Sequence, residues 1–344
     1  MRLFQRKASQ RKEAEMAAIA AFWQWWPSMR EVLDAAIQAG SVREHAEVIA
    51  QRVHAVHREL EWELTPGMGA RHALVVTSGG VAELRAVAAR WFAAAPAPDD
   101  IWEYHDIRRS DRMVFDSKLV FDDIKLEVDQ VRYAFSVDDQ RGQIDVLCYH
   151  PGFAGAPEQV QAQVTYLTLD WLLGEDRVET WIGAIHWTET APAMPQRPEE
   201  LRAAVDELAA RGDQWALMAA EGKDGLPRMA VANLPLRSAR WPRFDTHLGV
   251  TLPYRTFNEG RLPIDTSLQA LRDFEDMLVA TVGADGTLVA HETGNRLRTL
   301  HIYVDSQSGA RGRVETALPG WSEGRAGLDA TYDPRLSKVE HLSG

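Results

Sequence analysis

Apolar residues recur at intervals of three and four along several stretches of this chain, and the clearest case lies near the N-terminus. Between residues 42 and 60 the successive apolar positions are Val42, Ala46, Ile49, Val53, Val56 and Leu60. Residues spaced in this way share one face of an α-helix. The pattern therefore predicts a helix that packs this face against a core or against a partner helix.

A second pattern, over residues 261–305, predicts a helix followed by a β-hairpin. Thr266 and Gln269 match a capping box at the start of the helix, and Gly283 would end it. Two strand-like runs follow, and the Gly-Asn pair at 294–295 between them suits a tight hairpin turn. The apolar positions of the helix are Leu268, Leu271, Phe274, Leu278 and Val282.

Short strand-like runs and single helices alternate through most of the remaining sequence. The second half has the predicted order β-β-β-α-β-β-α-β, and the first half begins with helices and continues with hairpins and single helices. Several neighbouring strands lie too close in sequence for a crossover helix, which argues against a doubly wound parallel sheet. We therefore predict an α+β fold with two antiparallel sheets, each with helices packed on one face, a ferredoxin-like character, and helices at the N-terminus.

A chain of 344 residues is too long for one ordinary hydrophobic core, so two domains are expected. Residues 190–198 contain three prolines and have no apolar periodicity, which favours an exposed connection. The predicted organisation is an N-terminal α+β domain over 1–189, a proline-rich linker and helix over 190–213, and a C-terminal α+β domain over 214–344.

The formal net charge of −12 is unevenly distributed. Residues 99–145 contain 13 acidic and 7 basic residues, and therefore hold about half of the excess. Negative charge of this size argues against a general nucleic-acid binder and suits a basic protein partner. The first twelve residues, in contrast, include five basic and no acidic ones. We expect a disordered terminus there, and the alternative is an arm that contacts an anionic surface or RNA.

The single cysteine, Cys148, excludes an intrachain disulfide and fits a reducing compartment. No run approaches the ~20 apolar residues of a membrane span. Acidic residues precede the apolar run near the start, which argues against a cleaved signal peptide. We therefore expect a cytoplasmic protein that has no contact with a membrane.

Motifs for catalysis or metal binding are weak, because the sequence contains no P-loop, GxGxxG, HExxH or CxxC pattern. The Ser-Gly-Gly turn at 78–80 could bind an anion at a helix start. His54 and His57 could share a metal ion. Cys148 could form a nucleophilic pair with His150. A structural role is favoured for each, so no catalytic, cofactor-binding or metal-ligating residue is predicted, and no cofactor.

Two groups of charged residues are candidates for contacts with another molecule. The first consists of acidic doublets in predicted turns, whose carboxylates would present a negative face to a basic partner. The second is a pair of arginines on one face of a predicted strand, which could clamp an anion, although ordinary surface pairing is favoured. These residues are Asp122, Asp123, Asp138, Asp139, Arg296 and Arg298.

The C-terminal half contains the motifs MAVANLPL, YRTFNEGRLPIDTSLQALRDFEDML with its Glu275-Asp276 pair, LHIYVD and the late YDP. Together they resemble the bacterial family called domain of unknown function 695. The N-terminal half, with its aromatic cluster at 22–25, resembles sequences that commonly precede that domain. The chain departs from the family at Leu336, where an aromatic residue is usual. The family has no established activity, and its similarity to small regulators of ribonuclease E implies a regulatory role by analogy.

The leading interpretation is a cytoplasmic binding or regulatory protein that contacts another macromolecule, and a protein is the favoured partner. The acidic composition and the 12 tryptophans suit this interpretation. The alternatives are a hydrolase-like enzyme with a dispersed carboxylate or histidine site, and a small-ligand-binding module with an apolar cleft. Converging carboxylates or histidines with shifted pKa values in a cleft would favour an enzyme, whereas a flat patch that carries tryptophan would favour a protein partner.

Overall fold

The computed structural model describes residues 2–111, 115–121 and 124–343, with side chains from residue 12 onward. Its contacts divide the chain into two units, Met1–Arg108 and Arg109–Gly344. None of the helices in these described ranges is long and apolar enough to cross a membrane.

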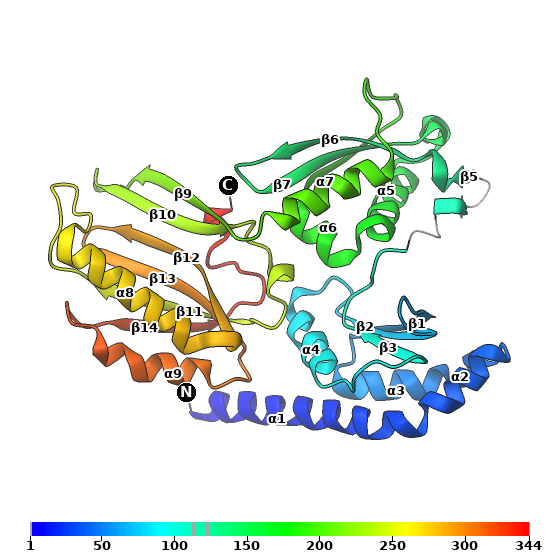
Figure 1. Cartoon of the computed structure of the whole chain (residues 1–344), viewed down its shortest axis with the longest axis horizontal. Helices are drawn as coiled ribbons and strands as arrows, with labels where there is room; N and C mark the ends of the chain where they lie inside the picture. The colour runs from blue at the N-terminus through cyan, green and yellow to red at the C-terminus, as the bar shows by residue number, and fades with distance from the viewer. Residues whose placement is uncertain (1, 112–114, 122–123, 344) are drawn as a thin grey trace. The chain divides into compact units, whose positions relative to one another are not determined.

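The first unit contains a small sheet with strand order β1-β2-β3 (Figure 1). Strand β1 is antiparallel to β2, whereas β3 is parallel to β2. The parallel pair can form because helix α4 connects β2 to β3 and so provides the crossover. The elements are α1 (Arg2–Trp25), α2 (Arg30–Gln38), α3 (Ala46–Val56), β1 (Glu61–Pro66), β2 (His72–Thr77), α4 (Ala82–Ala93) and β3 (Trp102–His105).

The helical stripe predicted over residues 42–60 is confirmed in its central part. Helix α3 buries Ile49, Val53 and Val56, while its predicted first turn is a short 3-10 helix at Val42–His45. The disordered terminus was a wrong prediction, because the backbone of α1 is helical from Arg2.

Aromatic rings build much of the core of the first unit. Trp26, Trp91 and Trp102 are buried, and the rings of Trp26 and Trp102 meet edge to face at 5.1 Å. Trp26 Nε1–H donates a hydrogen bond of 2.8 Å to the Tyr104 hydroxyl, so the buried indole keeps a polar partner. The high tryptophan content is therefore explained here by core packing.

The second unit begins with two small sheets, β4-β5 and β6-β7-β8. Strand β7 is antiparallel to β6 and parallel to β8, and helices α5 and α6 make the connection to β8. The elements are β4 (Lys118–Phe121), β5 (Ile124–Glu127), β6 (Arg132–Asp138), β7 (Gln143–Tyr149), α5 (Glu158–Leu173), α6 (Glu175–Trp181), β8 (Ile182–Thr188) and α7 (Pro198–Ala210).

The proline-rich stretch at 190–198 is mostly exposed and irregular, as predicted. The contacts of the chain nevertheless divide between Arg108 and Arg109. Helix α7, which we placed with the linker, buries Leu201, Val205 and Leu208 in the same core as β6, β7 and α5. The prolines mark a loop, but the apolar face of α7 after this loop packs in the core formed by the elements before it.

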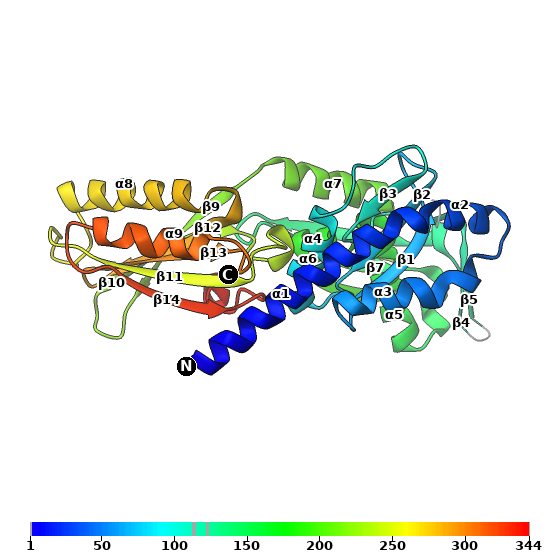
Figure 2. The same cartoon turned by 90° about the horizontal axis from the view of Figure 1, so that it is seen from below.

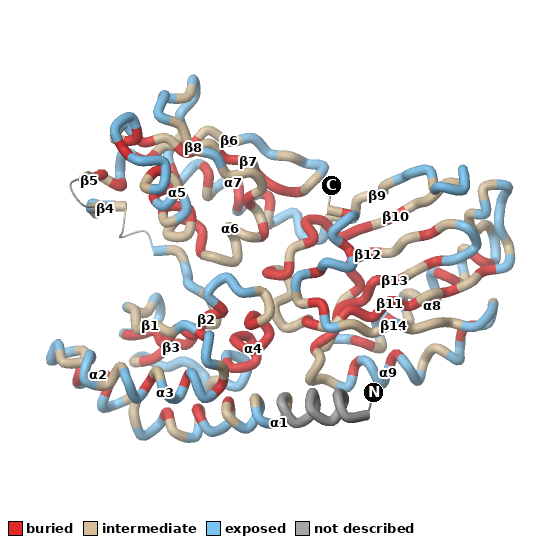
Figure 3. Tube along the Cα trace, turned by 180° about the vertical axis from the view of Figure 1, so that it is seen from behind, coloured by how far each residue is buried: buried red, intermediate tan, exposed pale blue. Residues whose placement is uncertain are grey.

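The C-terminal part of the second unit is a six-stranded antiparallel sheet with the order β14-β11-β13-β12-β10-β9. Figure 3 shows that the buried residues of this sheet are concentrated in its central strands, whereas exposed residues follow β9. The elements are β9 (Gln214–Glu221), β10 (Pro227–Leu234), β11 (Thr246–Pro253), α8 (Asp265–Val282), β12 (Gly286–Gly294), β13 (Leu297–Val304), α9 (Ala310–Ala317) and β14 (Gly327–Tyr332).

The two faces of this sheet are covered by different parts of the chain. Helices α8 and α9 lie next to one another on the first face (Figure 2), where their apolar residues pack with Leu248, Leu300 and Ile302. We call this the helix face. The segment after β14 covers part of the opposite face, where Leu336 and Val339 pack with other buried apolar residues of the sheet. We call this the tail face.

The predicted helix and hairpin are confirmed, but two local details were wrong. Helix α8 begins one residue before Thr266, has Ile264 at its N-cap and makes no side-chain capping bond. The positive φ angles of the hairpin turn occur at Asn295 and Arg296, one residue later than predicted.

The prediction of mixed helix and sheet is confirmed, whereas its details are not. The described residues form four sheets instead of two, and β2–β3 and β7–β8 are parallel pairs. Among the described sheets with three or more strands, only the six-stranded sheet is fully antiparallel, as predicted.

Phe274 on the buried face of α8 provides a test of this packing. Its ring lies 5.2 Å from that of Trp321, and 8% of the residue is exposed. Phe274→Ala should lower the free energy of unfolding by ~3–5 kcal/mol, because it removes buried area and leaves a cavity. Urea denaturation measures this change, with the exposed Val279→Ala as control, expected within about 0.5 kcal/mol of wild type. A loss below about 1 kcal/mol for Phe274→Ala would contradict the assigned face.

Candidate functional site

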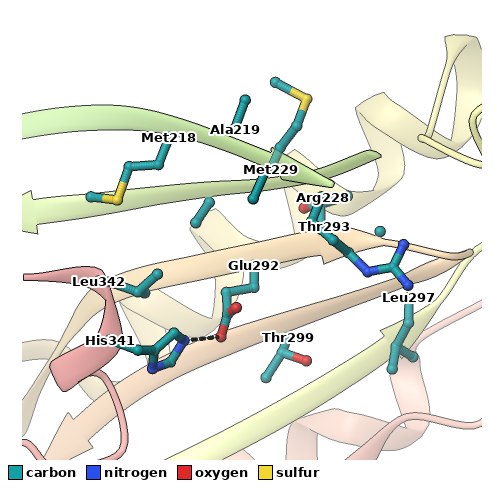
Figure 4. A pocket seen from close by; sticks show the side chains of 13 residues that line it. Met218, Ala219, Arg228, Met229, Glu292, Thr293, Leu297, Thr299, His341 and Leu342 are labelled. Atoms are coloured by element: carbon teal, nitrogen blue, oxygen red, sulfur yellow. Dashed lines mark hydrogen bonds and ion pairs between the residues drawn. The ribbon is translucent and has the colours of Figure 1, made fainter. Parts of the chain in front are cut away.

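A cavity of about 380 Å³ opens on the tail face of the six-stranded sheet (Figure 4). Strands β9, β10, β12 and β13 supply its floor and walls, and the chain end adds His341 and Leu342. Five of the lining residues have polar side chains, and the rest are apolar. The polar ones on which the site depends are Arg228, Glu292, Thr299 and His341.

Strand register explains why these side chains meet. Glu292 of β12 lies opposite Ala230 of β10 and opposite Thr299 of β13, so the three side chains share the tail face. Ala230 in turn lies opposite Met218 of β9. Ala230 is small, whereas Met218 and Glu292 beside it are longer, so the space over Ala230 is not filled.

A chain of hydrogen bonds leads from this cavity into the sheet. Glu292 Oε1 lies 3.2 Å from His341 Nε2 and 3.0 Å from His301 Nε2. His301 Nδ1 lies 3.0 Å from His247 Nε2, so the chain ends at a buried imidazole. Among the described residues, His247 Nδ1 has no hydrogen-bond partner.

Small neighbours make room for the two buried imidazoles. His301 on β13 lies between Gly249 of β11 and Ala290 of β12 in the strand register. A Cβ atom at Gly249 would come within 3.1 Å of the His247 ring. The glycine at this position therefore allows the rings to lie against the sheet.

Burial and hydrogen bonding determine the charge states of His247 and Glu292. Burial lowers the pKa of His247 to about 4, and the neighbouring His301 adds to this shift, so His247 is neutral near pH 7. The hydrogen bond from His301 lowers the pKa of Glu292, which keeps its carboxyl group ionised. The hydrogen-bonded chain therefore has a carboxylate at the cavity and a neutral histidine at its buried end.

Asp333, in the YDP motif, anchors the segment that brings His341 to the cavity. Its carboxylate accepts a hydrogen bond of 2.6 Å from the Tyr303 hydroxyl and further bonds from the backbone N–H groups of Ser337 and Lys338. Leu336, where the sequence departs from the resembled family, is buried on the tail face. Asp333 therefore positions the cavity wall without lining the cavity.

The two predicted interaction arginines do not converge. Arg298 is 6% exposed on the helix face, where its Nε–H donates to Thr293 Oγ1 at 3.0 Å and a guanidinium nitrogen lies 3.4 Å from Glu275. Arg296 lies in the hairpin turn, with its guanidinium 4.7 Å from the centre of the Phe257 ring. The predicted shared strand face is therefore wrong for this pair, because Arg296 lies in the turn and Arg298 is buried.

The predicted acidic residues have local partners where the structure describes them. Asp138 accepts bonds from two backbone N–H groups of its turn and pairs with Arg141 at 2.7 Å. Asp139 pairs with Arg211 at 2.7 Å. Asp122 and Asp123 lie outside the described residues, so a common negative face stays a prediction.

The surroundings of two weaker sequence motifs argue against the binding and catalytic roles considered for them. A Cβ atom on Gly79 would lie 2.9 Å from the carboxyl carbon of Glu61, and a carboxylate so close opposes phosphate binding at the 78–80 turn. Burial raises the pKa of the Cys148 thiol to about 12, and His150 instead bonds Glu127 and Gly152. In the described ranges no group of three or more His, Cys, Asp or Glu residues could hold a metal ion.

The outer edge of β9 is a second candidate surface. Trp215 and Leu217 on its helix face are 46% and 65% exposed, and residues 214–220 carry no charged side chain. A bond of 2.8 Å from Gly222 N–H to the Leu226 carbonyl closes the turn to β10. Because ladder bonds fall on alternate residues, the odd-numbered residues of β9 direct their N–H and C=O groups outward. No strand in the described part of this unit pairs with that edge.

Sequence reasoning missed all four members of the hydrogen-bonded chain. Glu292 and His301 belong to the predicted hairpin, and the correct turn position pairs Glu292 with Thr299, which makes His301 a near neighbour of Glu292 on the same face. His247 and His341 join them through strand order and through the tail, and neither is visible in sequence spacing.

No protein-family model matches the chain, and no match was found among curated proteins or among solved structures. The resemblance to the domain of unknown function 695 therefore stays a prediction.

Stability should depend on pH through His247, because its pKa is near 4 in the folded chain and about 6.5 when unfolded. The unfolded chain binds the proton first, so stability falls as the pH falls through 6.5 toward 4. Between pH 7 and pH 5 wild type should lose about 2 kcal/mol more than His247→Gln, measured by urea denaturation at each pH. The exposed His54→Gln should keep the wild-type dependence. Equal losses in wild type and His247→Gln would refute this assignment.

Proposed function

We propose that this chain acts by binding a protein partner, and that the partner adds an extended segment to the outer edge of β9. The observation that carries the proposal is an edge strand whose residues 214–220 have no charged side chain and in which Trp215 and Leu217 are exposed on one face. Main-chain groups of the odd-numbered residues would bond the added strand, and these two side chains would give it an apolar contact. The opposite edge of the sheet differs, because β14 carries the exposed Asp329.

An edge of this kind is a liability unless it is covered. Sheet proteins usually protect their edges with charges, proline, bulges or very short strands, because a bare edge pairs with other chains. Strand β9 has eight residues, and Glu221 at its end is its only charged side chain. A regular partner at this edge would explain why the protection is missing.

The fold offers a reason for the position of the edge. We propose that the segment β11-α8-β12-β13-α9-β14, with its spatial order β14-β11-β13-β12, is a ferredoxin-like unit of the split β-α-β type. Strands β10 and β9 then form an added hairpin that moves the sheet edge away from β12. A cytoplasmic location is part of the same proposal and rests on the single, buried Cys148.

Leu217→Lys tests the proposal, because a lysine on the helix face of β9 would place an unpaired charge in the partner contact. Proteins captured from the native cell by wild type are first identified, and the affinity of each purified candidate is then measured. The true partner should bind Leu217→Lys at least ~10-fold more weakly, a loss of about 1.4 kcal/mol. Val120→Lys, at another exposed strand position, is the matched control and should bind like wild type.

Hydrogen exchange on the complex gives a second readout. The amides of Trp215, Leu217 and Ala219 should become protected when the partner binds, because their N–H groups face the edge. Unchanged exchange at all three, or equal affinity for Leu217→Lys and wild type, would refute strand addition. A dimer of this chain in light scattering that Leu217→Lys converts to monomer would replace the proposed partner with a second copy.

A further inference from the structure

Glu292 presents an oxygen to the cavity that the described protein groups do not engage. Both of its imidazole contacts end on Oε1, one from His341 and one from His301. Among the described residues Oε2 has no hydrogen bond, and Figure 4 shows this oxygen directed away from His341. The Glu292 side chain is 40% exposed, so a ligand can reach it.

The remaining charge in the cavity favours a cationic ligand. Arg228 is the cationic side chain of the lining, but its guanidinium pairs with Asp224 at 2.8 Å and also donates to the Pro227 carbonyl. Its positive charge is therefore already matched by a carboxylate. Glu292 has histidines as its neighbours, and the hydrogen bond from His301 keeps it ionised. A half-buried carboxylate of this kind is stabilised by charge-assisted bonds from N–H donors.

The rest of the cavity is suited to an apolar body. Met218, Ala230, Leu297 and Leu342 contribute apolar surface, and the Thr299 hydroxyl can form one further hydrogen bond. The volume of about 380 Å³ lies at the lower end of the range for small-molecule sites, which is roughly 300–1,000 Å³.

We propose that this cavity binds a small molecule in which a protonated amine or a guanidinium group is joined to an apolar body. The cationic group would bond Glu292 Oε2, and the apolar body would contact Met218 and Leu342. This site lies on the tail face, opposite the side chains of Trp215 and Leu217, so it does not depend on the proposed partner at the β9 edge.

Three probes that share one ring and differ in charge test the proposal: benzylamine, benzyl alcohol and benzoate. Isothermal titration calorimetry at pH 7 should detect benzylamine binding to wild type, with benzyl alcohol at least ~10-fold weaker and benzoate weakest. Glu292→Gln keeps the size of the side chain and removes its charge. It should weaken benzylamine binding at least ~10-fold and leave benzyl alcohol binding nearly unchanged.

Two further variants keep the test decisive. Val120→Lys, at an exposed strand position outside the cavity lining, is the control and should bind benzylamine like wild type. Ala230→Leu places a larger side chain in the cavity next to Glu292 and should weaken all three probes together. It also replaces Glu292→Gln as the test if that variant does not fold.

Several results would overturn the proposal. Absence of benzylamine binding at 10 mM, an order-of-magnitude limit for a weak fragment, would remove the site. Benzoate binding as tight as that of benzylamine would refute the charge preference. Equal benzylamine affinity in wild type and Glu292→Gln, or in wild type and Ala230→Leu, would place binding elsewhere. None of these results bears on partner binding at β9, which Leu217→Lys tests separately.

Discussion

The need to bury both faces of one wide sheet determines most of the C-terminal structure. A sheet in water must cover its apolar face with another element, and this sheet has six strands to cover. Helices α8 and α9 pack with the central strands on the helix face, and the segment after β14 packs on the tail face. The cover is least complete over β9, where the odd-numbered residues on the helix face are exposed and the even-numbered residues on the tail face are mostly half-buried. The cavity and the bare edge both lie where the cover ends.

The buried polar groups of the tail face follow from the same constraint. Covering this face with a tail instead of a helix brings backbone N–H groups against the sheet, and these groups need acceptors. Asp333 accepts two of them together with the Tyr303 hydroxyl. His247 and His301 share one hydrogen bond, and Glu292 extends this hydrogen-bonded chain to the cavity. A polar network thus holds in place the tail that forms one wall of the site.

Sequence patterns predicted the elements better than their arrangement, and the reasons are local. The stripe of α3 and the helix of Phe274 were found because apolar periodicity directly reports a buried face. The capping box at Thr266 failed because tertiary contacts decide that turn: Ser267 Oγ accepts a bond from Thr256 N–H and donates one to Glu323. The parallel pairs were missed although helices lie between their strands, because close strand pairs elsewhere suggested hairpins throughout.

The site was harder to predict than the fold because its residues come together through register. Arg298 was expected at the surface, since alternation tells which residues share a face but not which face a helix will cover. Glu292 and His301 are nine residues apart across a turn whose position was predicted one residue too early. His247 joins them only when β11 lies beside β13, a pairing between strands separated by α8 and β12.

Strand β9 connects the two candidate surfaces physically. Its even-numbered Met218 lines the cavity, whereas the neighbouring Leu217 lies on the helix face, so one backbone carries a contact for each. If the cavity ligand or the partner orders β9 on binding, less conformational entropy is lost when the other one binds. Thermodynamic linkage then requires the effect to be reciprocal: a ligand that tightens partner binding by some factor is itself bound more tightly by the same factor. The size of that factor depends on how mobile β9 is before either site is occupied, because a strand already rigid in the unbound chain has no entropy left to share.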